Sequence, residues 1–174
     1  PGDVLATADE QSMRSVADAG ALDGGSEVFA TNRIVLAVPT RDDARVTAVA
    51  DLADPGVRYV VCVPEAPCGH VARAALAANG VDAAPASEEV DVKAVLTKVR
   101  LGEADAGLVY ATDVRAARDA VRALELSGGA ATVTRYAVAV LGDAEEPELA
   151  RDWVDLLTSD AGRAVLDDAG FGRP

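Results

Sequence analysis

The residues with the most chemical potential lie in one short segment of the 174-residue chain. Cys62 and Cys68 stand six positions apart, and His70, the only histidine, follows them. In an exported protein the two cysteines can close a small disulfide loop; otherwise they are free thiols packed as small apolar groups. A cysteine near a histidine also raises the alternative of a Cys-dependent α/β enzyme. A lone histidine in a first helical turn is, however, more typical of a surface residue.

The same segment can bind an oxyanion. Residues 64–70 follow the apolar strand expected over 58–63 and enter a helix expected over 69–78. Ligands of open α/β sheets bind at the carboxyl ends of strands, where helix N-termini offer free N–H groups and a positive dipole end. Gly69 permits a close backbone approach. The pattern indicates an anion contact near Cys68, with an ordinary strand-to-helix connection as the alternative.

Two further positions share this chemistry. The helix expected over 91–101 begins at Asp91-Val92-Lys93, and Tyr110 ends the strand expected over 107–110. A second helix N-terminus and a phenol hydroxyl would suit a dehydrated anion with several oxygens. The alternative for Tyr110 is a half-buried core tyrosine.

Strands and helices alternate along the chain, which predicts the α/β class with a mostly parallel sheet. Further strands are expected over 3–7, 34–38, 131–133 and 136–141, and further helices over 9–18, 147–157 and 160–169, with another capped by Thr112-Asp113. The apolar strands 34–38 and 136–141 flank the middle region. They are expected to be the crossings between two lobes.

Composition removes several function classes. Sixteen Lys and Arg against 29 Asp and Glu give a net charge of −13, which argues against nucleic acid and anionic membrane surfaces as partners. The chain has no phosphate-binding glycine loop, no dinucleotide fingerprint and no nucleophile elbow, and its Cys and His are too few for a zinc site. We therefore expect no catalytic residues, no cofactor and no directly coordinated metal.

Three segments together resemble the molybdate-binding proteins of ABC importers: residues 60–69, 89–96 and 102–113. Residues 2–10 and 169–172 agree, so the resemblance runs through the whole chain in order. It implies a type II periplasmic-binding-protein fold with two α/β lobes and an anion in the cleft between them. Lobe 1 would comprise residues 1–38 and 132–174, and lobe 2 residues 39–131.

The resemblance also implies a set of ligands. The backbone N–H groups of Cys68 and Val92 and the hydroxyl of Tyr110 would bind molybdate, and tungstate as well. Family members begin with a further strand–helix–strand segment that carries two serine ligands, whereas this chain starts after that segment. We therefore expect lobe 1 to be incomplete at its N-terminus and to expose apolar surface.

The function implied is capture of the oxyanion outside the cytoplasm, in the periplasm or cell envelope, with a lipid anchor left open. The protein would be a monomer that delivers its ligand to the membrane permease subunits of an ABC importer. Three alternatives stay open: a same-fold protein for another anion such as sulfate or phosphate, a cytoplasmic regulator of the same fold, and the Cys-dependent enzyme. The cysteine pair favours export.

Overall fold

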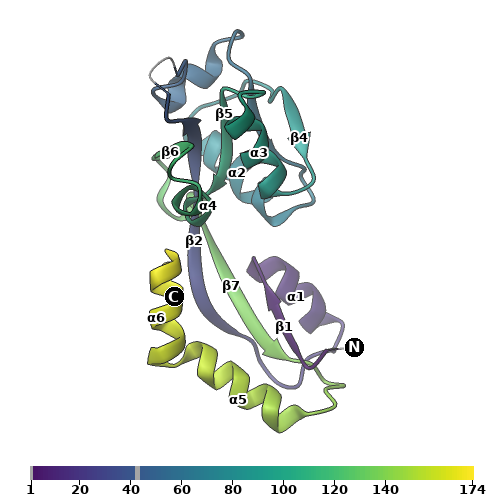
Figure 1. The fold of residues 1–174 in the computed structure, drawn as a ribbon. Helices are drawn as coiled ribbons and strands as arrows, with labels where there is room; N and C mark the ends of the chain where they lie inside the picture. Colours follow the sequence, from purple (N-terminus) through teal and green to yellow (C-terminus); the bar gives the residue numbers. More distant parts are fainter. Residues whose placement is uncertain (1, 42–43) are drawn as a thin grey trace. The chain divides into compact units, whose positions relative to one another are not determined.

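The structure is a computed structural model that describes residues 2–41 and 44–174, and the chain divides into two compact units. Unit 1 comprises Pro1–Asn32 and Thr134–Pro174, and unit 2 comprises Arg33–Val133. The strands β2 (Glu27–Pro39) and β7 (Val133–Val140) include the two points at which the chain passes from one unit to the other (Figure 1). Among the described residues, no helix is long and apolar enough to cross a bilayer.

The sheet of unit 2 is mixed, so the expectation of a mostly parallel sheet is wrong. Strand β3 (Tyr59–Cys62) runs parallel to β4 (Ser87–Glu89) and to β5 (Ala106–Tyr110), whereas β2 runs antiparallel to β5 and to β6 (Val121–Leu124). Parallel neighbours need a crossover of a dozen or more residues. Helix-containing crossovers link β3 to β4 and β4 to β5, whereas the described residues between β2 and β3 contain the short 3-10 turn over 49–53 and no α-helix.

The crossover helices of unit 2 are α2 (Pro67–Ala78) and α3 (Val92–Leu101). Helix α3 lies against β5, and Gly107 permits that contact. A Cβ atom at Gly107 would stand 2.7 Å from the Val95 side chain and 2.9 Å from that of Val99. The shorter elements are α4 (Ala111–Ala116) and the 3-10 turns η1 (Val49–Ala53) and η2 (Gly129–Thr132).

Unit 2 contains a large buried core. Leu36 of β2 pairs with Leu108 of β5, and neither side chain is exposed. The buried carboxylate of Asp105 lies at the start of β5, where it accepts hydrogen bonds from the N–H (2.9 Å) and the guanidinium of Arg58. Burial alone would raise the pKa of Asp105, but these bonds and the Arg58 charge outweigh it and hold the pKa below its usual value.

Two strands of unit 2 were not expected from the sequence. Strand β4 has the polar sequence Ser-Glu-Glu, which does not resemble a buried strand. It lies at the end of the strand order, where backbone hydrogen bonds to β3 hold it in the sheet. Glu89 of this strand accepts hydrogen bonds from Ser87 and from the ammonium of Lys98 (2.5 Å). Those two bonds lower the pKa of Glu89. Strand β6 follows the six-residue helix α4.

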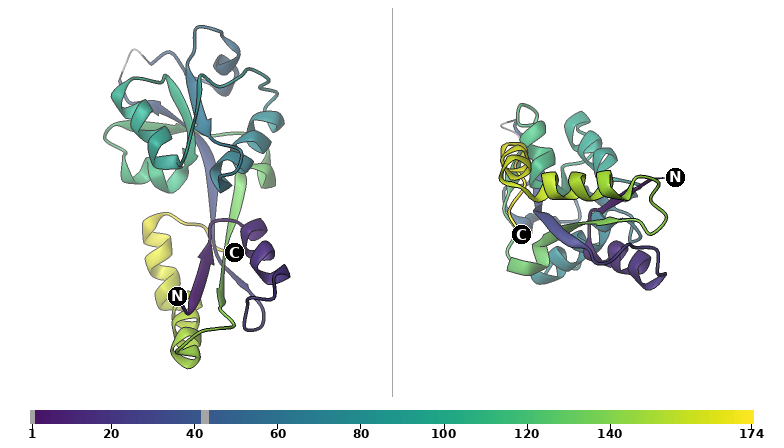
Figure 2. Two further views of the ribbon diagram at one scale, coloured as in Figure 1. Left: turned by 90° about the vertical axis from the view of Figure 1, so that its right-hand side faces the viewer. Right: turned by 90° about the horizontal axis from the view of Figure 1, so that it is seen from below.

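Unit 1 is built from both ends of the chain. Strand β1 (Val4–Thr7) pairs antiparallel with β7, and the helices are α1 (Glu10–Asp18), α5 (Pro147–Thr158) and α6 (Asp160–Ala169). Figure 2 shows α1 on one side of the β1–β7 pair and α5 with α6 on the other. The Ser159 side chain caps α6, as its position before that helix suggested, and the Asp9 side chain, expected as the first helical residue, caps α1.

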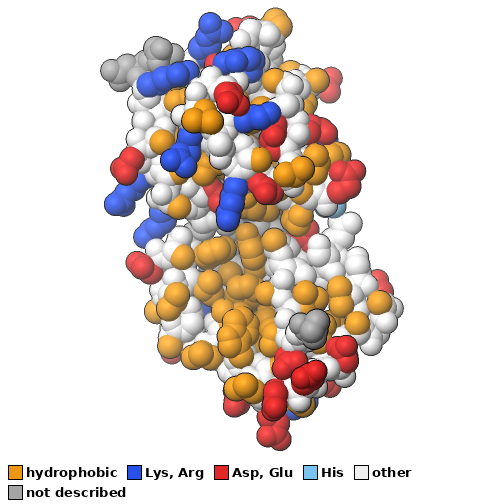
Figure 3. All heavy atoms as spheres, turned by 45° about the vertical axis from the view of Figure 1, so that its right-hand side comes forward, with side chains coloured by type: hydrophobic (Ala, Val, Ile, Leu, Met, Phe, Trp, Pro, Cys, Tyr) orange, Lys and Arg blue, Asp and Glu red, His pale blue; other side chains and the backbone are white. Residues whose placement is uncertain are grey.

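The buried core of unit 1 is small. Its cluster of buried apolar residues contains Met13, Ala137 and Ala139, with partly buried Leu5 and Leu22 packed against them. Large apolar side chains on α5 and α6 are exposed to solvent: Leu149 by 66%, Trp153 by 47%, Leu156 by 58% and Val165 by 70%. Figure 3 shows hydrophobic side chains gathered over a face of unit 1. The expected exposure of apolar surface in this part of the chain is confirmed.

Candidate functional site

Three strand-to-helix junctions of unit 2 lie at one edge of its sheet. Strands β5, β3 and β4 are neighbours and point the same way, so their carboxyl ends meet at that edge. Helices α4, α2 and α3 follow these three strands, respectively (Figure 1). The N–H of Val63 donates to the carbonyl of Glu89 (2.8 Å), which keeps the ends of β3 and β4 together beyond their ladder. Cys68, Val92 and Tyr110 therefore belong to one end of the unit.

Cys68 is the second residue of α2, and its side chain is buried. It forms a disulfide with Cys62, the last residue of β3, with the two Cα atoms 5.8 Å apart. The disulfide confirms the expected pairing and removes the free-thiol alternative. A nucleophilic cysteine must be a free thiolate, so this bond also argues against the Cys-dependent enzyme. His70 is exposed in the first turn of α2, as its position indicated.

Gly69 allows the loop between β3 and α2 to fold closely on itself. A Cβ atom at this position would stand only 2.0 Å from the carbonyl oxygen of Val63. The N–H of Ala66 donates to that same oxygen (3.1 Å), and the N–H of Gly69 donates to the carbonyl of Ala66 (2.9 Å). The disulfide and this tight packing together fix the backbone that carries the Cys68 N–H.

Val92 is the first residue of α3, and Asp91 is its N-cap. The Asp91 carboxylate accepts a hydrogen bond from the N–H of Ala94 (2.8 Å). The first N–H groups of a helix have no acceptor within the helix. The N–H of Val92 is one of these groups, so it has the donor chemistry that the sequence suggested.

Tyr110 is the last residue of β5 and the N-cap of α4, and it is only 7% exposed. The carboxylate of Asp113 accepts a hydrogen bond from the Tyr110 N–H (3.0 Å). Burial raises the pKa of Asp113, although the Tyr110 bond and the nearby Lys93 ammonium act in the opposite direction. The sequence pattern placed the cap at Thr112-Asp113. Instead, Tyr110 is the N-cap, and Asp113 is the third residue of the helix. Its carboxylate accepts a hydrogen bond from the N–H of the N-cap residue, as the third residue does in a capping box.

Asp113 is a charged residue at this edge that the sequence pattern marked only as a helix cap, whereas Lys93 belongs to the helix start that the pattern had indicated as an anion position. The charge of Lys93, on the second residue of α3, acts on Asp113 in the first turn of α4. The signal present in the sequence was a carboxylate three residues after a strand end, a spacing that often marks a helix start. The three groups expected from the sequence to contact the anion, two N–H groups and one hydroxyl, are neutral. Among residues 2–41 and 44–174, no group of three or more His, Cys, Asp or Glu side chains could hold a metal ion.

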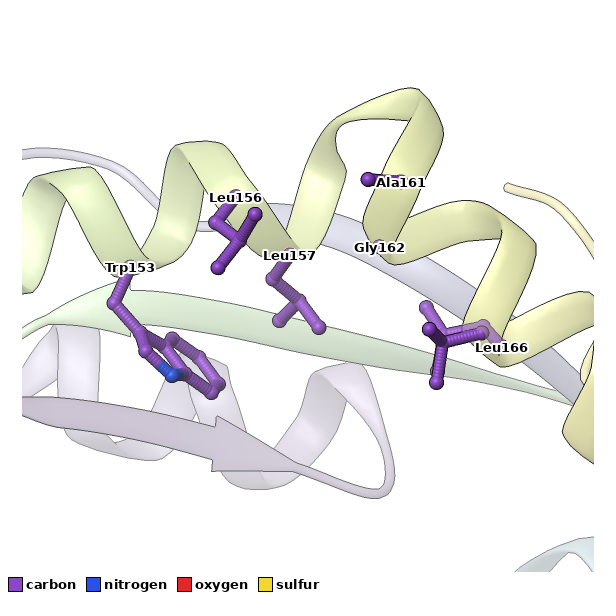
Figure 4. Close-up of a pocket in the computed structure, with 7 residues that line it drawn as sticks. Trp153, Leu156, Leu157, Ala161, Gly162 and Leu166 are labelled. Atoms are coloured by element: carbon purple, nitrogen blue, oxygen red, sulfur yellow. The ribbon is translucent and has the colours of Figure 1, made fainter.

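A separate hollow lies between α5 and α6 in unit 1. Its volume is about 320 Å³, and its lining is apolar: Trp153, Leu156, Leu157, Ala161, Gly162, Val165 and Leu166. Figure 4 shows how side chains from the two helices line it. A hollow without side-chain hydrogen-bond donors, apart from the single indole N–H, suits apolar contact and not an oxyanion.

Comparisons with known proteins agree on the class of protein. A family model described as bacterial extracellular solute-binding protein matches residues 1–172. The molybdate-binding protein ModA of Mycobacterium tuberculosis H37Rv is 42% identical over 172 residues. That alignment covers 99% of this chain and 66% of the relative, so the chain spans slightly less than two thirds of the relative's length.

Solved structures share the fold at low sequence identity. The periplasmic molybdate-binding protein of Azotobacter vinelandii has a TM-score of 0.83 at 20% identity, covering 100% of this chain and 79% of that one. The sulfate-binding protein SubI of Mycobacterium tuberculosis H37Rv has a TM-score of 0.80 at 13% identity, covering 98% and 68%. These likenesses confirm the type II periplasmic-binding-protein fold. Together with the family match, they show that the chain is a member of the bacterial extracellular solute-binding protein family.

Proposed function

We propose that the protein captures molybdate, and tungstate as well, outside the cytoplasm for an ABC importer. The backbone N–H groups of Cys68 and Val92 and the hydroxyl of Tyr110 are the proposed donors. The observation that carries this proposal is the presence of all three residues at the strand-to-helix junctions that follow three neighbouring parallel strands. The 42% identity to a relative named as a molybdate-binding protein supports the choice of ligand.

Neutral donors suit the capture and release of a dianion. Helix N-termini stabilise negative charge through N–H groups and the helix dipole, without a bound cation. The net charge of −13 disfavours an anion at long range, so the binding energy must come from these local dipoles. Selection against sulfate would follow from size, because a larger oxyanion can span a ring of donors that a smaller one cannot.

The proposed mode of action is that of a two-lobed binding protein. Lobe 1 would comprise residues 1–38 and 132–174, and lobe 2 residues 39–131; the proposed donors all belong to lobe 2. Ligand contacts made only in a closed state would shift the open–closed population towards closure. The closed monomer would then deliver its ligand to membrane permease subunits, acting as a carrier without catalysis. A location in the periplasm or cell envelope fits the description of the family as extracellular.

Titration calorimetry of the full-length protein with molybdate, tungstate, sulfate and phosphate tests this proposal. We expect binding of molybdate and tungstate and much weaker binding of sulfate. Tyr110→Phe should weaken molybdate binding by about tenfold, the value of one hydrogen bond to a charged group. Equal affinity for sulfate and molybdate would refute selection by size, and an unchanged affinity in Tyr110→Phe would remove Tyr110 from the site.

Tyr59→Phe is a matched control for that variant. Tyr59 is also a buried strand residue of unit 2, but its hydroxyl donates to the carbonyl of Ala83. The control should therefore lower the free energy of unfolding by about 1 kcal/mol and leave the molybdate affinity unchanged.

A further inference from the structure

We propose that Asp113 is a positioning residue for Tyr110: its carboxylate fixes the backbone from which the Tyr110 hydroxyl reaches the oxyanion. The inference rests on the proposed function, since it concerns the same site. Its basis is the 3.0 Å hydrogen bond from the Tyr110 N–H to the Asp113 carboxylate. This bond spans the point at which the chain leaves β5 and enters α4.

The orientation of the Tyr110 ring depends on this junction. Tyr110 has extended backbone angles (φ −77°, ψ 152°) and still pairs with Ile34 of β2, whereas the next residue is already helical. The ladder with β2 holds one side of the junction, and the Asp113 bond ties the other side to the first turn of α4. Helix α4 has only six residues, so it contributes little rigidity of its own. Loss of the Asp113 bond should therefore loosen the backbone that carries the phenol.

The partly buried position of Asp113 disfavours its charged form, so the hydrogen bond from the Tyr110 N–H must compensate for that loss of free energy. The raised pKa of Asp113 reflects that partial burial. A negative charge near a bound oxyanion would also repel it, so Asp113 is not a ligand. The ammonium of Lys93 attracts the carboxylate and offsets part of both costs. The acceptor atom should thus help binding, and the charge should not.

Replacement of the acceptor and replacement of the charge separate these two effects. In the full-length protein, Asp113→Ala should weaken molybdate binding by about tenfold, the value of a hydrogen bond to a charged group. Asp113→Asn keeps an oxygen acceptor without the charge, so it should bind molybdate as tightly as the native protein or more tightly. Asp113→Val, which fills the same space with apolar atoms, replaces the alanine variant if that variant does not fold.

A double-mutant cycle with Tyr110→Phe shows whether Asp113 acts through the hydroxyl. We expect the Tyr110→Phe/Asp113→Ala protein to bind molybdate as weakly as Tyr110→Phe alone, because the hydroxyl to be positioned is already absent. Equal losses from Asp113→Ala with and without the hydroxyl would overturn the proposal. Equal affinities of Asp113→Asn and Asp113→Ala, both weaker than native, would also overturn it.

Asp51→Ala is the matched control. Asp51 also caps a short helix of unit 2, where its carboxylate accepts hydrogen bonds from the N–H groups of Thr47 (2.8 Å) and Ala48 (3.0 Å). This variant should lose stability and keep its molybdate affinity; a tenfold weaker affinity would show a general structural effect and overturn the proposal. If the native protein binds no molybdate, or Tyr110→Phe binds like native, the proposed function itself fails. If the native protein binds molybdate and Tyr110→Phe weakens that binding, but the effects of Tyr110→Phe and Asp113→Ala simply add, the proposed function is retained and the positioning role of Asp113 is refuted.

Discussion

Replacement of Gly69 by alanine probes the tight loop that presents the Cys68 N–H. The added Cβ would stand 2.0 Å from the Val63 carbonyl oxygen, 2.8 Å from the Val63 carbonyl carbon and 3.0 Å from the Cys62 carbonyl oxygen. Ordinary contacts of a Cβ begin at 3.4 Å, so the loop would have to open by about 1.4 Å. The obstacles are backbone atoms within a loop closed by the Cys62–Cys68 disulfide, which limits such movement.

Two opposing energies decide the size of the effect. Overpacking against rigid groups costs about 3 kcal/mol at the upper end of its usual range. Alanine in a helix gains about 1 kcal/mol over glycine. The net loss for Gly69→Ala is then about 2 kcal/mol in the free energy of unfolding, or roughly 4–8 °C in Tm for a chain of this length. The affinity for molybdate should fall as well, because the shifted loop carries the Cys68 N–H.

Urea unfolding followed by far-ultraviolet circular dichroism measures this loss. Gly25→Ala is the control, because no atom lies within 4 Å of the Cβ that it would add and its φ is not positive. That variant should differ from native by less than about 0.5 kcal/mol. A Gly69→Ala protein within the same margin would refute the reasoning, since the loop would then be free to open at little cost.

The rest of the structure supports three further predictions. Replacement of Cys62 and Cys68 together by serine should cost about 2 kcal/mol in urea unfolding, the chain-entropy value for a disulfide closing a loop of six residues; an unchanged midpoint would contradict it. Asp105→Asn should destabilise the protein at pH 7, because the lowered pKa of Asp105 adds stability above its unfolded value of 3.8. The difference in the free energy of unfolding between the native protein and Asp105→Asn should shrink as the pH falls through the pKa of Asp105 in the folded protein, which lies below 3.8. A difference that does not change with pH would argue against the Arg58 contacts as its source. Acrylamide should quench the fluorescence of Trp153, the only tryptophan, because it is 47% exposed in this chain; strong protection would mean that other residues cover it.

The sequence predicted the local features of the fold well, since their causes are local. The helix starts expected near Asp9 and Asp91 and the cap expected at Ser159 depend on side chains within three residues of the N–H groups that they bind. The antiparallel pairing of β2 was not predictable in the same way. It joins segments such as Ile34 and Tyr110 that are far apart in the chain, and neither segment carries a signal for the direction of its partner.

The features of the candidate site also separate into those that depend on local sequence and those that depend on long-range pairing. The pattern of strand ends and helix starts in the sequence was sufficient to place Cys68, Val92 and Tyr110 at junctions. The shared edge of the three junctions depends on the strand order β5-β3-β4, which no short pattern encodes. The bond between Asp113 and Tyr110 was missed for a different reason. A carboxylate in a first helical turn predicts a cap, but it does not reveal that burial will make it a support for the preceding residue.

The continuity of unit 2 has a consequence for synthesis. All of its residues lie between Arg33 and Val133, whereas unit 1 needs Thr134–Pro174 to complete its sheet and helices. A chain emerging from the ribosome or from an export channel therefore holds a complete unit 2 while the first segment of unit 1 still lacks its partners. The pairing of β1 with β7 can form only after β7 has been made. Intermediates arrested at this stage should show protected amides in β3 and β5 and rapid proteolysis within residues 2–32.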